Sequence, residues 1–199
     1  GLVGSEMCIR DRDEQAAKTA LEHQKILAKP PLALGKLEPV AIQIAAMTGN
    51  PAPRLKDKAG VLFAADHHIA DHGLSLTSTD VTYIQTRNFL QGGGTINAFT
   101  RNAGARLSVV DVGVNYDFGD LPGLVKRKVM HGANDFSRGP AMTREQALEC
   151  LQVGIDMARE EKARGLDIVA AGEMGIGNTT PSSAIAVSYT HLRAHETLR

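Results

Sequence analysis

An apolar run followed by three glycines and three polar residues, within residues 166–180, constrains the fold of this chain most strongly. The run at 166–171 is short and apolar, which is typical of a buried parallel strand. Asn178, Thr179 and Thr180 are residue types that favour the start of a helix. Because free backbone N–H groups at a helix start attract anions, this succession predicts a phosphate site in an α/β fold.

The residues inside this turn indicate which ligand it could bind. Gly172, Gly175 and Gly177 permit close backbone approach or a positive φ. Glu173 is unsuited to a phosphate, so we expect it to accept hydrogen bonds from sugar hydroxyls, as in a ribose phosphate or nucleotide. The spacing matches neither common nucleotide-binding motif, since no Lys follows the last glycine and Thr180 stands where a third glycine is required. A tight turn without a ligand is therefore the alternative that spacing leaves open.

Alternating strands and helices predict a Rossmann-like parallel sheet with flanking helices and right-handed crossovers. We expect strands at 61–65, 107–112 and 167–171, and helices at 13–28, 36–47, 80–90, 95–103 and 144–164. The first two helices precede a Gly/Pro-containing linker at 49–53 and are expected to belong to a small helical domain that is incomplete here. Apolar residues at helical spacing define one face of the second helix: Leu37, Val40, Ile44 and Met47.

Acidic residues follow or end each predicted strand, at Asp66, Asp111 and Glu173. Parallel strands bring their carboxyl ends to one edge of the sheet, which is where such folds bind ligands. Each acid could instead cap a helix or pair with an arginine at 101, 106 or 138. We favour a structural role for Asp111 and a functional role for Glu173.

A histidine cluster lies directly after the first predicted strand. His68 and His72 are four residues apart, so on a helix they would share a face with metal-ligand spacing. No Cys or further carboxylate is clearly placed to complete a metal site, and we predict none. A metal-dependent enzyme built on His67, His68 and His72 remains a rival hypothesis that metal analysis would separate.

The charge balance argues against a nucleic-acid partner and favours a small organic substrate. Lys plus Arg and Asp plus Glu each number 22, and the chain has five Phe, three Tyr and no Trp for base stacking. No apolar run is long enough to cross a bilayer, so we expect no membrane partner. Cys150 is expected to be a buried small hydrophobe in a reducing cytoplasm.

The segment 172–180, GEMGIGNTT, resembles the motif of the nicotinate-nucleotide:dimethylbenzimidazole phosphoribosyltransferase family, which makes the lower-ligand nucleotide of cobalamin. The resemblance covers residues 13–186. Further matching segments lie at 29–38, 88–93, 111–114 and 134–143.

This resemblance implies transfer of the phosphoribosyl group of nicotinate mononucleotide to 5,6-dimethylbenzimidazole or a related base, which gives α-ribazole 5′-phosphate and nicotinate. It also implies a cytoplasmic homodimer when full length, with no cofactor. The substrate-binding residues that it implies are Ser75 at the base pocket, Glu173 at the ribose, and Gly175, Gly177, Asn178, Thr179 and Thr180 at the phosphate.

Several positions depart from the family pattern. Ile84 stands where the family has a glutamine that frames the base, which makes the pocket more apolar. The preferred base could therefore be another benzimidazole, a purine or a phenolic compound. Thr77-Ser78 replaces Tyr-Pro. Leu32 and Ala33 replace Gly and Ser, which weakens a ligand role for that segment.

Both ends fall outside the resemblance. Residues 1–12 and 187–199 look like translated adaptor sequence, with a native disordered terminus as the alternative, which leaves 13–50 as the helical segment and 51–186 as a partial α/β domain. We therefore discount Cys8, His191 and His195. The family's general-base glutamate would lie beyond the chain, so no catalytic residue is assigned and we expect little or no activity from these residues alone. A non-catalytic ribose-phosphate-binding module is the second hypothesis.

Overall fold

The structure is a computed structural model that describes residues 12–190, without the side chain of Thr190. The chain forms two compact units, Gly1–Leu55 and Lys56–Arg199. The discounted residues Cys8, His191 and His195, and most of both predicted tails, lie outside the described residues.

The first unit is a helical hairpin made of α1 (Glu14–Ile26) and α2 (Leu37–Thr48). The carboxylate of Asp13 caps α1 by accepting a hydrogen bond of 2.8 Å from the Ala16 backbone N–H. Small buried side chains let the two helices approach closely: Ala16, Ala20, Ala45 and Ala46. The predicted apolar face of α2 is largely exposed on this unit, where Leu37 and Met47 are 66% and 63% accessible.

The connection between α1 and α2 carries an unfavourable backbone conformation at Leu32. Leu32 has φ 61°, in the left-handed region, and its side chain is exposed. The β-carbon makes this region costly for a leucine, whereas glycine adopts it freely. The family that the sequence resembles has glycine at this position. The positive φ explains that glycine, and Leu32 departs from the family pattern at this strained position.

The second unit contains a four-stranded parallel sheet in the order β3-β2-β1-β4. Its elements are β1 (Lys58–Ala65), η1 (His68–His72), α3 (Val81–Leu90), α4 (Thr95–Ala103), β2 (Arg106–Gly113), β3 (Leu124–Lys126), α5 (Arg144–Ala163), β4 (Ile168–Met174) and α6 (Thr179–Thr190). The order reverses between β1 and β4, which are neighbours in the sheet although far apart in sequence. The predicted α/β parallel architecture is confirmed.

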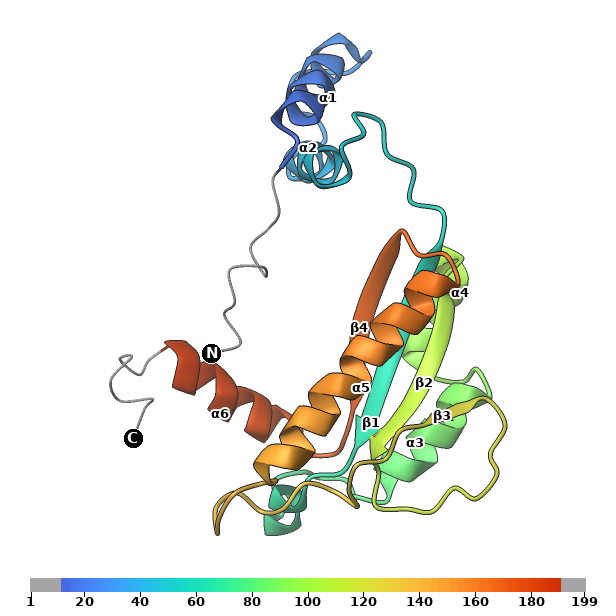
Figure 1. The fold of residues 1–199 in the computed structure, drawn as a ribbon, viewed down its shortest axis with the longest axis vertical. Helices are drawn as coiled ribbons and strands as arrows, with labels where there is room; N and C mark the ends of the chain where they lie inside the picture. The colour runs from blue at the N-terminus through green and yellow to red at the C-terminus, as the bar shows by residue number, and fades with distance from the viewer. Residues whose placement is uncertain (1–11, 191–199) are drawn as a thin grey trace. The chain divides into compact units, whose positions relative to one another are not determined.

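Helices lie on both faces of the sheet, with α5 on one face and α3 and α4 on the other (Figure 1). On one face, Val61 and Val110 pack with Val153 and Met157 of α5. On the other face, Leu62, Val109 and Leu124 pack with partly buried residues that include Phe89, Leu90 and Ile96 of α3 and α4. The sheet is thus covered on both sides at β1 and β2. Residues 168–171 of β4 are exposed, so the strand expected there forms but is not buried among the described residues.

A buried carboxylate on α5 is satisfied by a local network. Glu161 is fully buried and accepts hydrogen bonds from Arg106, Ser108 and Arg164 at distances of 2.7–3.2 Å. Burial raises the pKa of Glu161, but these donors and charges outweigh it and hold the pKa below its ordinary value. Arg106 therefore ties the start of β2 to α5.

Three features differ from the sequence expectations or extend them. The three-residue strand β3 was not predicted. Helix α6 continues to Thr190, past residue 186, after which the sequence predicted a non-native tail. That tail boundary stays a prediction. Cys150 is only partly buried on α5, and burial raises the pKa of its thiol. Among the described helices, none combines the length and apolar character that a membrane span requires.

Candidate phosphate and substrate site

The glycine-rich segment lies at the carboxyl end of β4, beside the carboxyl end of β1. Parallel pairing places Glu173 opposite Phe63 and Met174 opposite Ala64. The chain then turns into α6 at Thr179. In α/β sheets, ligands bind in the crevice at the point where the strand order reverses, and this segment lies at that point.

Two glycines of this segment are required by close packing against β1 and η1. A β-carbon at Gly175 would lie 2.2 Å from the Ala65 carbonyl oxygen and 3.1 Å from Nε2 of His67. Gly177 has φ 78°, and a β-carbon there would lie 2.7 Å from Cβ of Ala70. The Ile176 N–H also donates to the buried hydroxyl of Thr82, at 3.1 Å. The turn is therefore fixed to β1, η1 and α3 by its own backbone.

Two ionisable side chains belong to this turn or lie against it: Glu173 is part of the segment, and His67 lies beside Gly175. Glu173 is exposed and accepts a hydrogen bond from the side-chain amide of Asn178 at the start of α6. Burial lowers the pKa of His67 below its ordinary value of 6.5, against the opposing charges of Asp66 and Glu173. This shift favours the neutral imidazole, which has one donor and one acceptor nitrogen beside the turn.

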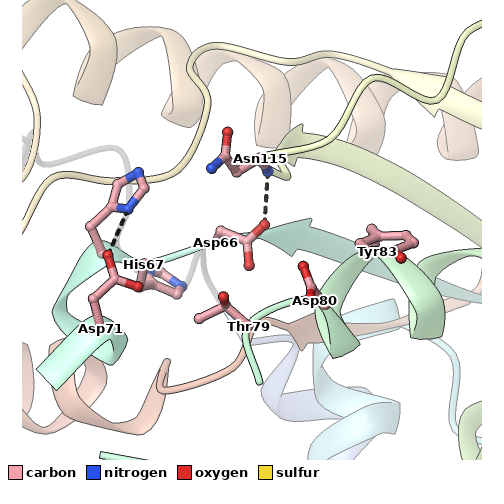
Figure 2. Close-up of a pocket in the computed structure, with 8 residues that line it drawn as sticks. Asp66, His67, Asp71, Thr79, Asp80, Tyr83 and Asn115 are labelled. Carbon is pink, nitrogen blue, oxygen red and sulfur yellow. Dashed lines mark hydrogen bonds and ion pairs between the residues drawn. The ribbon is translucent and has the colours of Figure 1, made fainter. Parts of the chain in front are cut away.

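A cavity of about 160 Å³ opens next to His67 (Figure 2). Its walls come from the end of β1, from η1, from the segment before α3, and from the loop after β2. The lining residues are Asp66, His67, His68, Asp71, Thr79, Asp80, Tyr83 and Asn115. They include three carboxylates and no lysine or arginine, so the cavity suits groups that donate hydrogen bonds and disfavours anions.

The three predicted strand-end acids have different surroundings. Asp66 lines the cavity, and Glu173 lies near enough to act on His67. Asp111 is instead buried, accepts from the Val114 N–H at 2.9 Å and pairs with Lys128 at 3.3 Å. The structural role predicted for Asp111 is thus supported. The ion pairs found among the described residues join none of these acids to the arginines considered from sequence.

The histidine spacing does not produce the single helical face that the sequence suggested. Residues 68–72 form a 3₁₀ helix, in which positions three apart, rather than four, eclipse one another. His68 contacts Asp71 and the His131 carbonyl, both at 3.2 Å, whereas Nε2 of His72 lies 2.7 Å from Asp135. Among residues 12–190, no group of three potential ligands is arranged to hold a metal ion.

The residues expected at the base pocket lie outside the cavity. The Ser75 hydroxyl is 3.0 Å from that of Thr77, in the loop between η1 and α3. Ile84 lines a separate depression on α3 together with Gln85 and Asn88. Their assignment to a base pocket stays a prediction.

Other residues of the site were not found from sequence. Thr79, Asp80, Tyr83 and Asn115 line the cavity, and Thr82 anchors the glycine-rich turn. Thr79 and Asp80 carry one usable signal, because they stand at the start of the helix expected at 80–90, where polar residues are typical. Tyr83 and Asn115 carry none, since their position depends on how distant segments pack.

Taken together, the parallel sheet, the glycine-rich turn at its order reversal and the adjoining polar cavity define an α/β protein with a candidate ligand site at the carboxyl edge of its sheet. The model of a family described as "Phosphoribosyltransferase" matches residues 9–199. The chain belongs to this phosphoribosyltransferase family.

Similar proteins carry one specific name. A nicotinate-nucleotide--dimethylbenzimidazole phosphoribosyltransferase from Geobacter sulfurreducens is 47% identical over 188 residues, which cover 94% of this chain and 53% of that protein. One from Chloroflexus aggregans is 45% identical, over 89% of this chain and 50% of that protein. A crystal structure of the enzyme so named from Thermus thermophilus matches with a TM-score of 0.85 and 42% identity, over 89% of this chain and 54% of that one. The chain spans about half the length of these relatives.

Proposed function

We propose that this protein transfers the phosphoribosyl group of nicotinate mononucleotide to 5,6-dimethylbenzimidazole or a related base, and that this chain supplies the nucleotide-binding residues. The observation that carries the proposal is the glycine-rich turn from β4 into α6, fixed beside His67 where the strand order reverses. The names of relatives that are 45–47% identical support the same substrates.

In this reaction the bond from C1 of the ribose to the nicotinate nitrogen breaks, and a bond from C1 to a nitrogen of the incoming base forms. The leaving nitrogen of nicotinate mononucleotide is a positively charged pyridinium nitrogen, so nicotinate leaves with little help from an acid. Holding the two reactants in line therefore supplies much of the catalysis. The attacking base also gives up its N–H proton, which requires a base that we do not assign among these residues.

The described residues would bind two parts of the nucleotide, its phosphate and its ribose, at different places. The start of α6, with Gly177, Asn178, Thr179 and Thr180, would hold the 5′-phosphate through backbone N–H groups and hydroxyls. Glu173 would accept hydrogen bonds from the ribose and stabilise positive charge as it develops on the sugar ring. A phosphate would avoid the cavity at Asp66, because carboxylates line it.

Binding of nicotinate mononucleotide to the purified chain, measured by isothermal titration calorimetry, tests this proposal. Glu173→Gln should weaken binding roughly tenfold, because a charge-assisted hydrogen bond to the ribose is lost. Glu149→Gln, the same change on the exposed surface of α5, is the matched control and should leave binding unchanged. Equal affinity of all three proteins would contradict the assignment of Glu173.

Release of nicotinate on addition of dimethylbenzimidazole separates an enzyme from a ribose-phosphate-binding module. A protein that binds the nucleotide but releases no nicotinate, even as the full-length gene product, would be a binding module. We also propose that the full-length protein is a cytoplasmic homodimer. Light scattering of the full-length protein would test its oligomeric state.

A further inference from the structure

The carboxylate of Asp66 has one oxygen with no partner among the described residues, although Asp66 is only 8% exposed. Oδ2 accepts a hydrogen bond of 2.7 Å from the Asn115 N–H. Oδ1 has no hydrogen bond. Figure 2 shows this carboxylate within the cavity, with its second oxygen turned toward the side of Thr79 and Asp80. A buried carboxylate oxygen without a donor is costly, so the arrangement needs an explanation.

The position of Asp66 is fixed by its backbone. Its N–H donates to the Gly113 carbonyl at 3.0 Å, and its own carbonyl accepts from Ala133 at 2.9 Å. The pairing of β1 with β2 shifts register between Ala64 and Ala65, directly before Asp66. Such irregularities are common beside functional sites. These contacts hold the backbone of Asp66, and the bond from the Asn115 N–H to Oδ2 orients its carboxylate so that Oδ1 lies buried at the cavity.

The charges around the cavity restrict the group that could satisfy Oδ1. Asp71 and Asp80 add two further carboxylates, His68 is paired with Asp71, and no lysine or arginine contributes to the lining. A phosphate or the carboxylate of nicotinate would be repelled. An O–H or N–H donor would be favoured, because a charge-assisted hydrogen bond would replace an unsatisfied acceptor.

We propose that Asp66 is a substrate-positioning residue whose Oδ1 accepts a hydrogen bond from an O–H or N–H group of a bound substrate. This inference rests on the proposed function, in which two substrates carry such a donor. One source is a ribose hydroxyl of the nucleotide, and the other is the azole N–H of the incoming base.

Two probes distinguish these sources: ribose 5-phosphate and 5,6-dimethylbenzimidazole, each titrated into the 199-residue chain. Asp66→Asn keeps an acceptor for the Asn115 N–H but turns an NH₂ group toward the cavity. Binding of the probe that contacts Asp66 should weaken roughly tenfold to a hundredfold. Asp120→Asn makes the same change at a fully exposed position and should alter binding by less than about twofold.

A measurement on the unsubstituted chain covers the case in which Asp66→Asn fails to fold. The ¹³Cγ resonance of Asp66 should shift when the bound probe donates to Oδ1, whereas that of Asp120 should not. A shift with ribose 5-phosphate assigns the sugar, and a shift with dimethylbenzimidazole assigns the base.

The result that overturns the inference alone is binding of nicotinate mononucleotide or either probe with no Asp66 shift and no loss in Asp66→Asn. The proposed function would then stand. If the unsubstituted chain binds neither the nucleotide nor either probe, the proposed nucleotide site fails, and the inference fails with it.

Discussion

The imidazole of His67 lies against the backbone of Gly175, so closely that a β-carbon on Gly175 would be 3.1 Å from both Nε2 and Cδ2. This contact joins the carboxyl ends of β1 and β4 at the reversal of strand order. Gly175 is therefore needed for packing between two strands, whether or not a ligand is bound. The two interpretations of the glycine-rich turn, a tight turn and a phosphate site, are thus compatible.

Gly175→Ala should destabilise the protein by about 1–3 kcal/mol, because the added methyl group would overlap the Ala65 carbonyl oxygen and force the turn away from β1. Urea unfolding measures the change in free energy of unfolding. Gly154→Ala is the matched control, since a β-carbon at this α5 position meets nothing within 4 Å. That control should stabilise the protein by about 0.5–1 kcal/mol, as alanine favours helix. A stable Gly175→Ala protein would mean that the turn packs less tightly against β1 than the structure shows.

Glu173→Gln should lower the pKa of His67 further, because the negative charge of Glu173 opposes the effect of burial. NMR titration of the His67 ring protons measures this pKa, and Glu149→Gln should leave it unchanged. Since the folded-state pKa lies below the ordinary 6.5, the unfolded chain binds the proton more readily. His67 therefore costs stability as the pH falls through 6.5, and this loss should be larger in Glu173→Gln. An unaltered His67 pKa would place Glu173 farther from the ring.

The sequence was sufficient for the elements with a strong pattern. The apolar runs that became β1 and β2 could be read directly, because burial on both sheet faces gives continuous apolar strands. The strand at β4 and the helix at α5 were also predicted, although residues 168–171 of β4 are exposed. Strand β3 could not, since three residues, Leu124, Val125 and Lys126, carry too little pattern. The 3₁₀ geometry at 68–72 was missed because local spacing does not distinguish it from an α-helical turn.

The site was only partly predictable for a different reason. Glu173 and the glycine-rich turn are adjacent in sequence, so their proximity needed only a strand and a helix. The free oxygen of Asp66 depends on where the Asn115 N–H falls after β2, and the close fit of Gly175 depends on pairing between β1 and β4. Such features follow from tertiary contacts, which a single sequence does not encode locally.

Glu161→Ala should cost about 3–5 kcal/mol, because the fully buried carboxylate neutralises Arg106 and Arg164 and accepts from Ser108. Glu160→Ala is the neighbouring control. Its carboxylate pairs with Arg127 at the surface, where the side chains are 47% and 43% exposed, so its loss should cost about 0.2–1 kcal/mol. Thermal and urea unfolding of both variants measure the difference. Equal costs would show that the buried network does not stabilise the contact between β2 and α5.

The Asp135 carboxylate should make the folded state sensitive to acid. Hydrogen bonds from Ser137 and His72 lower its pKa from 3.8 to about 2. Because the folded pKa lies below the unfolded one, the stabilisation is complete above pH 3.8 and is lost as the pH falls toward about 2. Asp135→Asn should therefore flatten the dependence of unfolding free energy on pH in that window, and Ser137→Ala should flatten it in part. Asp120→Asn, at an exposed position, should keep the full slope. Unchanged slopes in all three variants would mean that the contact between η1 and the segment before α5 does not form in solution.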